Sequence, residues 1–342
     1  MGMAKRATHM RPRVSIMMPL RQEGGGLQRV LEAVTAQDYP ALDSIVVAIG
    51  PGNDQTSDIV AEWAKRSSKL VPIANPEGIV STGLNRALEL IRSEYVVRID
   101  GHCLVPPDYV SRLLATALGT GADCVGPRLR TVGSSAKQRG IAAAMSSPFG
   151  VGGARFRTSG RSGYVDTVAF GLYKRNVFER IGGFREELVR NQDDEFNSRL
   201  RRSGGRIYLD AGVVVEYFPR SSFRALWRQY FQYGYWRVIT ARFLADPLRP
   251  RQLAPATMLL GLALAAVLAV SGSPALLVLV SVAYATVLAL CALQSFLFTK
   301  STAAALSGAA AAALLHFAYG SGSWWSLVRA RGLSPGGRTQ AT

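Results

Sequence analysis

Apolar residues along positions 13–127 follow two alternating patterns. Continuous apolar runs rich in Val and Ile, typical of strands buried on both faces, occur at 13–19, 43–50, 69–75, 95–100 and 122–127. Between these runs, apolar residues recur every three or four positions, which predicts helices over 26–37, 56–67, 81–93 and 107–118. Because strands and helices alternate, we expect an α/β fold with a doubly wound, mainly parallel sheet.

The pattern over the next ninety or so residues is less regular. It predicts strands over 165–175 and 206–218 and helices over 176–184 and 191–205. We therefore place one globular domain over 12–218, after a disordered N-terminus over 1–11.

The composition changes at Pro219. Residues 219–252 contain seven arginines and one acidic residue with aromatic residues between them, which predicts an amphipathic helix over 222–245 in a membrane interface. Two apolar runs follow at 253–270 and 275–298, and each is long enough to cross about 30 Å of hydrocarbon.

A third run at 302–320 is rich in Ala and Gly and less apolar. We expect a transmembrane region over 253–325 with two to three segments, of which three are favoured, and then a basic tail over 326–342. If the third run crosses the membrane, three tail arginines lie outside, against the positive-inside rule, so a re-entrant or interfacial third segment stays open.

The formal net charge is +17, which suits either nucleic acid or an anionic membrane surface. The apolar C-terminal runs favour the membrane, and we expect no nucleic-acid partner. Seven arginines precede the first apolar run, so the positive-inside rule predicts that domain 12–218 is cytoplasmic. Three scattered cysteines without a CxxC pair suit a reducing compartment.

Polar residues follow three of the predicted strands at their carboxyl ends, where open α/β sheets bind ligands. These residues are Pro19, Arg21 and Glu23 after the first strand, Asp54 after the second, and Asp100 and His102 after the fourth. We expect the three groups to meet in one crevice.

Asp100 and His102 are separated by a single glycine, Gly101. A carboxylate and an imidazole at this spacing can bind one divalent ion, Mg²⁺ or Mn²⁺, which neutralises a diphosphate leaving group. The alternative is structural: Asp100 caps the turn and His102 packs beneath it.

Three consecutive acids, Asp193, Asp194 and Glu195, begin the helix predicted over 191–205, so they cannot all point the same way. One of them could act as a general base, although an acidic first turn is also favoured by the helix dipole alone. Four arginines expected around the site could bind phosphates, namely Arg21, Arg155, Arg157 and Arg161, although most arginines in so basic a chain must be surface charge.

In their order, these motifs resemble a known family. Pro-x-x-x-Glu follows the first strand, Asp-Gly-His the fourth, and Gln-Asp-Asp-Glu and Gln-x-x-x-Trp come later. The order is similar to that of the family 2 inverting glycosyltransferases of GT-A fold, above all their membrane-anchored, succinoglycan glucosyltransferase (ExoA-like) subgroup. The resemblance covers roughly residues 12–325 and makes 12–218 the catalytic domain.

The resemblance implies a donor site. Pro19 and Glu23 match the motif whose Glu contacts the nucleotide, and Arg21 and Asp54 complete the expected donor-binding set. Asp100 matches the first Asp of the family's Asp-x-Asp motif for metal and diphosphate. His102 stands in place of the second Asp, so the resemblance leaves the identity of the metal open.

The resemblance also implies an acceptor site. Asp193 matches the family's catalytic base. Gln232 and Trp236 match the ends of the Gln-x-x-Arg-Trp motif of processive synthases, but Tyr235 replaces its Arg, so long-chain processive synthesis is not expected. Together with Asp194, Gln232 and Trp236 are the expected acceptor-binding residues.

The implied reaction moves a hexose from a nucleotide-diphospho-sugar to a hydroxyl of a lipid-linked, polyprenyl-diphosphate glycan. It would serve exopolysaccharide or cell-envelope polysaccharide synthesis at a bacterial-type inner membrane. Two alternatives stay open: a polyprenyl-phosphate hexosyltransferase, and a non-catalytic membrane scaffold of a polysaccharide complex.

Overall fold

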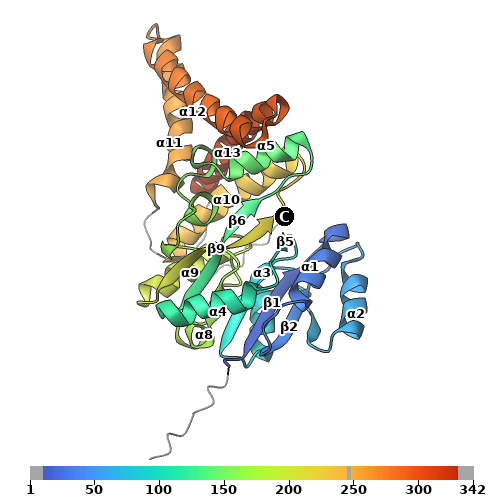
Figure 1. Cartoon of the computed structure of the whole chain (residues 1–342). Coiled ribbons are helices and arrows are strands. Elements are labelled where there is room, and N and C mark those ends of the chain that lie inside the picture. The colour runs from blue at the N-terminus through green and yellow to red at the C-terminus, as the bar shows by residue number, and fades with distance from the viewer. Residues whose placement is uncertain (1–10, 245–247, 330–342) are drawn as a thin grey trace, which may run out of the picture.

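The computed structural model describes residues 11–244 and 248–329. The expected disorder at 1–11 and the basic tail at 326–342 fall largely outside these described residues. Figure 1 shows an α/β domain below a set of long C-terminal helices.

Four parallel strands form one half of the sheet, as the sequence predicts. They lie in the order β3 (Leu70–Ala74), β2 (Leu42–Ile49), β1 (Val14–Leu20) and β4 (Tyr95–Arg98). All seven residues of β1 are buried, which explains its continuous apolar run. The predicted helices are α1 (Leu27–Thr35), α2 (Thr56–Arg66), α3 (Val80–Leu90) and α4 (Tyr109–Thr120).

The other half of the sheet is mixed. β8 (Leu172–Lys174) lies antiparallel between β4 and β6 (Cys124–Thr131), and β9 (Ile207–Tyr217) runs parallel to β6. Two short strands pair antiparallel with β9, namely β5 (Cys103–Leu104) and β7 (Gly163–Tyr164). Two helices confirm the sequence pattern, α8 (Arg175–Ile181) and α9 (Gln192–Arg202). The α/β class is confirmed, and the sheet is mixed, with its longer pairings parallel and its short ones antiparallel.

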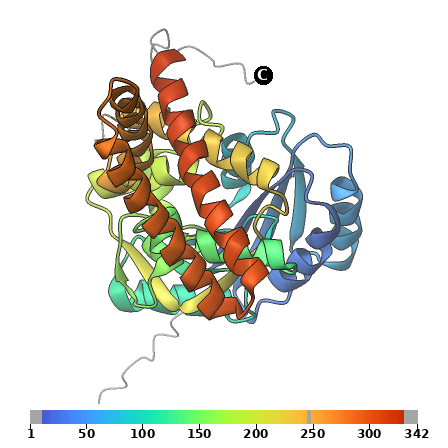
Figure 2. The same cartoon turned by 90° about the horizontal axis from the view of Figure 1, so that it is seen from above.

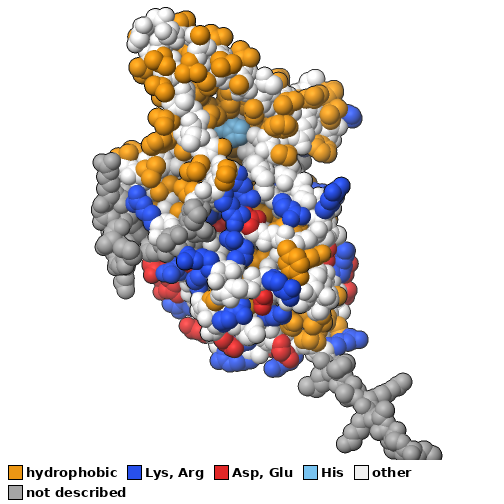
Figure 3. Space-filling model, turned by 90° about the vertical axis from the view of Figure 1, so that its left-hand side faces the viewer, with side chains coloured by type: hydrophobic (Ala, Val, Ile, Leu, Met, Phe, Trp, Pro, Cys, Tyr) orange, Lys and Arg blue, Asp and Glu red, His pale blue; other side chains and the backbone are white. Residues whose placement is uncertain are grey.

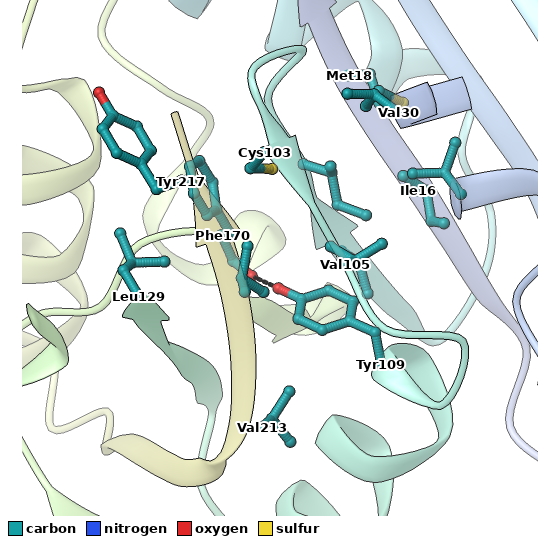
Figure 4. Close-up of a cluster of buried hydrophobic side chains, with 14 of the residues drawn as sticks. Ile16, Met18, Val30, Cys103, Val105, Tyr109, Leu129, Phe170, Val213 and Tyr217 are labelled. Atoms are coloured by element: carbon teal, nitrogen blue, oxygen red, sulfur yellow. Dashed lines mark hydrogen bonds between the residues drawn. The ribbon is translucent and has the colours of Figure 1, made fainter. Parts of the chain in front are cut away.

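The strand predicted over 165–175 is wrong for most of its length, because only Leu172–Lys174 is a strand. Phe170 has a φ of 53°, which interrupts the extended backbone. Its carbonyl accepts a hydrogen bond from the buried hydroxyl of Tyr109, in the core that Figure 4 shows. A buried tyrosine hydroxyl needs such a partner, and this tertiary contact overrides the local pattern.

Three helices lie in the region that the sequence pattern leaves irregular. They are α5 (Ala136–Met145), α6 (Pro148–Val151) and α7 (Arg155–Thr158). α5 begins with a capping box, in which Ser135 Oγ accepts from the Gln138 N–H at 3.2 Å and Gln138 Oε1 accepts from the Ser135 N–H at 3.4 Å. Ser-x-x-Gln is a sequence signal of a helix start, so α5 was within reach of sequence reasoning.

Beyond the domain, α10 (Phe223–Leu244) leads to a helical hairpin of α11 (Pro250–Val270) and α12 (Ala275–Thr299), followed by α13 (Thr302–Arg329). α11, α12 and α13 are each long and apolar enough to cross a membrane. Figure 3 shows hydrophobic side chains over the protruding hairpin and Lys and Arg side chains on the domain below it.

α13 is packed differently from the hairpin. In its most apolar stretch 44% of the residues are buried in the protein, against 11% in α11 and 6% in α12. It runs along α10 and α5, as Figure 2 shows from above. Two glycines allow this close approach. A Cβ atom at Gly140 would lie 2.5 Å from the Ala304 carbonyl oxygen, and a Cβ atom at Gly234 would overlap the Tyr319 carbonyl oxygen.

The structure changes one predicted boundary. α13 continues to Arg329, so residues 326–329 belong to a helix and not to a tail. The helix predicted to lie in a membrane interface corresponds to α10. Tyr230 and Trp236 on it are buried in protein and Trp227 is exposed, so its place in an interface stays a prediction.

Candidate functional site

A cavity of about 1230 Å³ begins at the carboxyl ends of β1 and β4 and extends to the C-terminal helices. Most of the expected site residues line it, namely Pro19, Arg21, Glu23, Asp100, His102, Asp193, Asp194 and Gln232. Asp100 and Asp193 are far apart in the sequence, and the fold brings both to this cavity.

Gly101 lets the end of β4 approach the end of β1. A Cβ atom at Gly101 would lie 2.6 Å from Glu23 Cγ and 2.6 Å from Leu20 Cδ2, so no larger residue fits without a shift. His102 Nδ1 lies 3.8 Å from Glu23 Oε2, and the His102 ring meets the Tyr217 ring edge-on at 5.2 Å. The glycine therefore holds Glu23 and His102 at one wall of the cavity.

Arg98, which sequence reasoning missed, lies directly beside this wall. It is 4% exposed and donates from Nε to Asp100 Oδ1 at 3.0 Å and from Nη2 to Asp100 Oδ2 at 3.2 Å. Burial by itself would lower the pKa of Arg98, but the carboxylates of Asp100 and Asp193 raise it well above its usual range. The carboxylates of Asp100 and Asp193 thus both interact with one permanent cation.

The three consecutive acids of α9 lie in three different environments. Glu195 is fully buried and forms ion pairs with Arg185 at 2.9 Å and Arg199 at 2.8 Å. Asp194 pairs with Arg237 of α10. Asp193 lines the cavity, and its Oδ1 accepts from the Asp194 N–H at 3.0 Å.

Hydrogen bonds join the residues before α9 to α10, and they fix the position of Asp193. Arg190 Nε donates to Gln232 Oε1 at 3.2 Å, and Asn191 Nδ2 donates to the Tyr233 carbonyl at 3.1 Å. Asn191 has a φ of 60°, a left-handed conformation that asparagine tolerates better than most residues.

Two expected site residues lie elsewhere. Asp54 accepts hydrogen bonds from the Gly24 N–H at 3.1 Å and Thr56 Oγ1 at 2.8 Å, and thus joins the first strand-end loop to the start of α2. Partial burial would raise the pKa of Asp54, but these hydrogen bonds lower it. Trp236 packs in a buried cluster with Leu188 and Ile239. Neither residue lines the cavity, so we leave both out of the proposed site.

Within the described residues, no cluster of three or more His, Cys, Asp or Glu side chains could hold a metal ion by itself. Asp100 and His102 nevertheless both line the cavity and offer one carboxylate and one imidazole. Such a pair fits a divalent ion that takes its remaining ligands from bound phosphates, as Mg²⁺ often does.

The far end of the cavity is apolar. Its lining includes Met258 of α11, Leu279 and Val287 of α12, and Leu315 of α13. A polar pair interrupts this wall, since Tyr284 Oη and His316 Nδ1 lie 3.2 Å apart. The cavity therefore joins a charged end in the α/β domain to an apolar end among the C-terminal helices.

The strand-end acids and the mixed sheet together form the arrangement expected of a glycosyltransferase with a GT-A type of fold. Residues 15–182 match the family described as "Glycosyl transferase family 2". The succinoglycan biosynthesis protein ExoA of Rhizobium meliloti (strain 1021) is 33% identical over 221 residues, which are 64% of this chain and 67% of that protein. The chain belongs to glycosyltransferase family 2.

A second relative comes from Methanococcus voltae and is named dolichyl N-acetyl-alpha-D-glucosaminyl phosphate 3-beta-D-2,3-diacetamido-2,3-dideoxy-beta-D-glucuronosyltransferase. It is 23% identical over 231 residues, which are 65% of this chain and 71% of that protein.

Solved structures share the fold. The mannosyltransferase PcManGT from Pyrobaculum calidifontis, in complex with GDP-Man and Mn²⁺, has a TM-score of 0.61 and 20% identity and covers 88% of this chain and 87% of its own. S. aureus TarS 1-349 with UDP-GlcNAc has a TM-score of 0.50 and 15% identity, over 71% and 73% of the two chains.

Proposed function

We propose that the protein transfers a hexose from a nucleotide-diphospho-sugar to a hydroxyl group of a lipid-linked glycan, with inversion at the anomeric carbon. The supporting observation is the single cavity that holds Asp100 and Asp193 at one end and apolar side chains of α11 and α12 at the other. The product would serve exopolysaccharide or cell-envelope polysaccharide synthesis, in keeping with the name of the ExoA relative.

In this mechanism Asp193 accepts the proton of the acceptor hydroxyl. The hydroxyl oxygen then attacks the anomeric carbon, and the bond to the nucleotide diphosphate breaks on the opposite face. Arg98 holds Asp100 in place, and its single positive charge partly offsets the charges of the Asp100 and Asp193 carboxylates. Pro19, Arg21 and Glu23 line the donor end of the cavity.

Asp100 and His102 would hold a divalent ion, Mn²⁺ or Mg²⁺, jointly with the diphosphate of the donor. The bound ion would stabilise negative charge on the leaving diphosphate. A structural neighbour bound to Mn²⁺ and GDP-Man supports this assignment.

Asp194 and Gln232 line the cavity, and we assign them to its acceptor half. The acceptor is lipid-linked in this proposal because the cavity continues into apolar helices that can cross a membrane. The Methanococcus relative, whose name specifies a dolichyl phosphate-linked acceptor, supports the same class of substrate.

For the membrane, we propose that α11 and α12 cross a bacterial-type inner membrane as a hairpin and that the catalytic domain is cytoplasmic. α13 would lie against α5 and α10 without crossing. Arg249, Lys300 and Arg329, at the ends of the three helices, then all lie on the cytoplasmic side, which satisfies the positive-inside rule. This arrangement removes the conflict that three crossing helices create.

The test is Asp193→Asn in the full-length protein, assayed with a panel of nucleotide sugars and an undecaprenyl-linked glycan. We expect kcat to fall by about 10²- to 10⁴-fold while donor binding is retained. Asp58→Asn, in the exposed first turn of α2, is the matched control. A small loss would favour a phosphate acceptor, which needs no base, and an inactive wild-type protein would favour a scaffold.

A further inference from the structure

The cavity contains more positive charge than the proposed donor site uses. Several arginines that line it are neutralised within the protein, since Arg98, Arg237 and Arg251 pair with Asp100, Asp194 and Asp166. Besides Arg21 at the donor end and Arg190, which donates to Gln232, three more have no carboxylate partner among the described residues, namely Arg157, Arg220 and Arg228. A cavity with uncompensated guanidinium groups is suited to an anionic ligand.

Arg157 on α7 is the most deeply placed of the three. Its guanidinium lies over the Tyr217 ring at 4.9 Å and beside the Phe156 ring at 5.5 Å. Its Nη1 atom is buried and has no hydrogen-bond partner within the part of the chain that the structure describes. A buried charged donor without a partner is costly, so a bound ligand that accepts its hydrogen bond would repay that cost.

A short chain of contacts links Arg157 to α10. The Tyr217 ring contacts both the Arg157 guanidinium, at 4.9 Å, and the His102 ring, at 5.2 Å. Gln229 Nε2 donates to Tyr217 Oη at 3.4 Å and to Tyr233 Oη at 2.9 Å. Gln229 belongs to α10, and α10 packs against α13. Arg157 is therefore connected through Tyr217 to the helix that packs against the apolar C-terminal segment.

Arg228 lies on the face of α10 that lines the cavity. Most residues of α10 that line the cavity recur at helical spacing, namely Ala225, Arg228, Gln229, Gln232, Tyr233 and Arg237, and Tyr230 lines it as well. Arg220 lines the cavity just before this helix.

We propose that Arg157, with Arg220 and Arg228, binds the phosphate groups of the polyprenyl-linked acceptor. The first isoprene units would lie against the apolar wall formed by residues such as Met258 and Leu279. This inference rests on the proposed function, because it assigns the acceptor half of the same site. The phosphate serves as a binding group here and takes no part in bond breaking, while Asp193 acts on the sugar hydroxyl.

Binding of farnesyl diphosphate to the full-length protein in detergent tests this subsite without sugar transfer. The titration is done with UDP and GDP in excess, so that the donor end is occupied, and farnesol is the ligand without phosphate. We expect saturable binding to the wild type, at least tenfold weaker binding of farnesol, and about tenfold weaker binding of farnesyl diphosphate to Arg157→Gln. Arg157→Lys should recover part of the loss, because it keeps the charge.

Arg224→Gln is the matched control, because Arg224 is exposed on α10 and does not line the cavity. Equal affinity of wild type and Arg157→Gln, or no binding at all, would overturn the proposal. An equal loss of nucleotide affinity in Arg157→Gln would also overturn it, since the arginine would then serve the donor or the fold. A wild-type protein that binds the lipid but transfers no sugar would count against the proposed function alone.

Discussion

Arg98 and Asp100 form a two-point ion pair at the wall of the cavity, with Nε–Oδ1 and Nη2–Oδ2 distances of 3.0 and 3.2 Å. The side chain of Asp100 is 17% exposed, while that of Arg98 is 5% exposed. The buried partner therefore sets the orientation in which the exposed one meets a ligand. Bidentate pairs of this kind fix geometry as well as charge.

Replacing Arg98 should separate its effect on the orientation of Asp100 from the effect of its charge. Arg98→Met leaves Asp100 without its partner and should destabilise the protein by about 3 kcal/mol. Arg98→Lys keeps the charge but loses the two-point contact, so it should fold and show a raised donor KM. Thermal unfolding measures the stability of both variants, and donor kinetics measure their KM. Wild-type kinetics in Arg98→Lys would show that the orientation of Asp100 is unimportant.

Glu195→Gln should affect stability more than chemistry. The fully buried carboxylate loses its charge between Arg185 and Arg199, and we expect the free energy of unfolding to fall by about 3 kcal/mol. The kcat of the folded fraction should stay within about threefold of the wild type, because Glu195 does not line the cavity. Asp193→Asn should show the reverse pattern, and a large kcat loss in Glu195→Gln at full stability would refute this division.

Gly101→Ala should weaken donor binding and stability together. The new Cβ atom would displace Glu23 and Leu20, and overpacking of this kind costs about 1 to 3 kcal/mol. Gly119→Ala in α4 is the matched control, because nothing lies within 4 Å of its Cβ position and alanine favours the helix. Unfolding and nucleotide titrations measure the two effects, and wild-type behaviour of Gly101→Ala would show that the two strand ends can separate freely.

Removal of divalent ions should abolish or strongly reduce transfer, and Mn²⁺ or Mg²⁺ should restore it. His102→Ala should raise the ion concentration needed for half-maximal activity by at least about tenfold, since loss of even an outer partner of a metal site costs that much. Ion-dependent nucleotide binding provides a second readout. Full activity in a chelator would mean that cationic side chains such as Arg21, without a metal ion, neutralise the donor diphosphate.

Reporter fusions test the position of α13. Alkaline phosphatase after residue 342 should be inactive and a fluorescent protein there active, because the end of α13 is expected on the cytoplasmic side. Phosphatase inserted at Gly272, in the turn between α11 and α12, should be active. Phosphatase activity at the C-terminus would show that α13 crosses the membrane.

Sequence patterns were sufficient to predict secondary structure and site residues where local and tertiary preferences agree. Continuous apolar runs located the parallel strands, and the strand-end rule placed Asp100 and Glu23 at one cavity. Asp193 was found through motif order, but its separation from Asp194 and Glu195 depends on arginines that come from elsewhere in the chain, such as Arg185 and Arg237.

The misses have physical causes. Arg98 stands inside an apolar run, and a charge in such a strand indicates a buried partner, which was a usable signal. The break at Phe170 was not readable, because it depends on Tyr109, 61 positions away. The packing of α13 on α10 was also not predictable. It depends on close glycine contacts between helices far apart in the sequence, and local periodicity carries no information on such contacts.

The close fit of α13 has a practical consequence for handling this enzyme. A soluble version ending at Leu244 would leave the faces of α5 and α10 that α13 covers in contact with water, including Gly140 and Gly234. Those faces would then promote aggregation. The C-terminal helices and the catalytic domain should therefore be purified together as one unit.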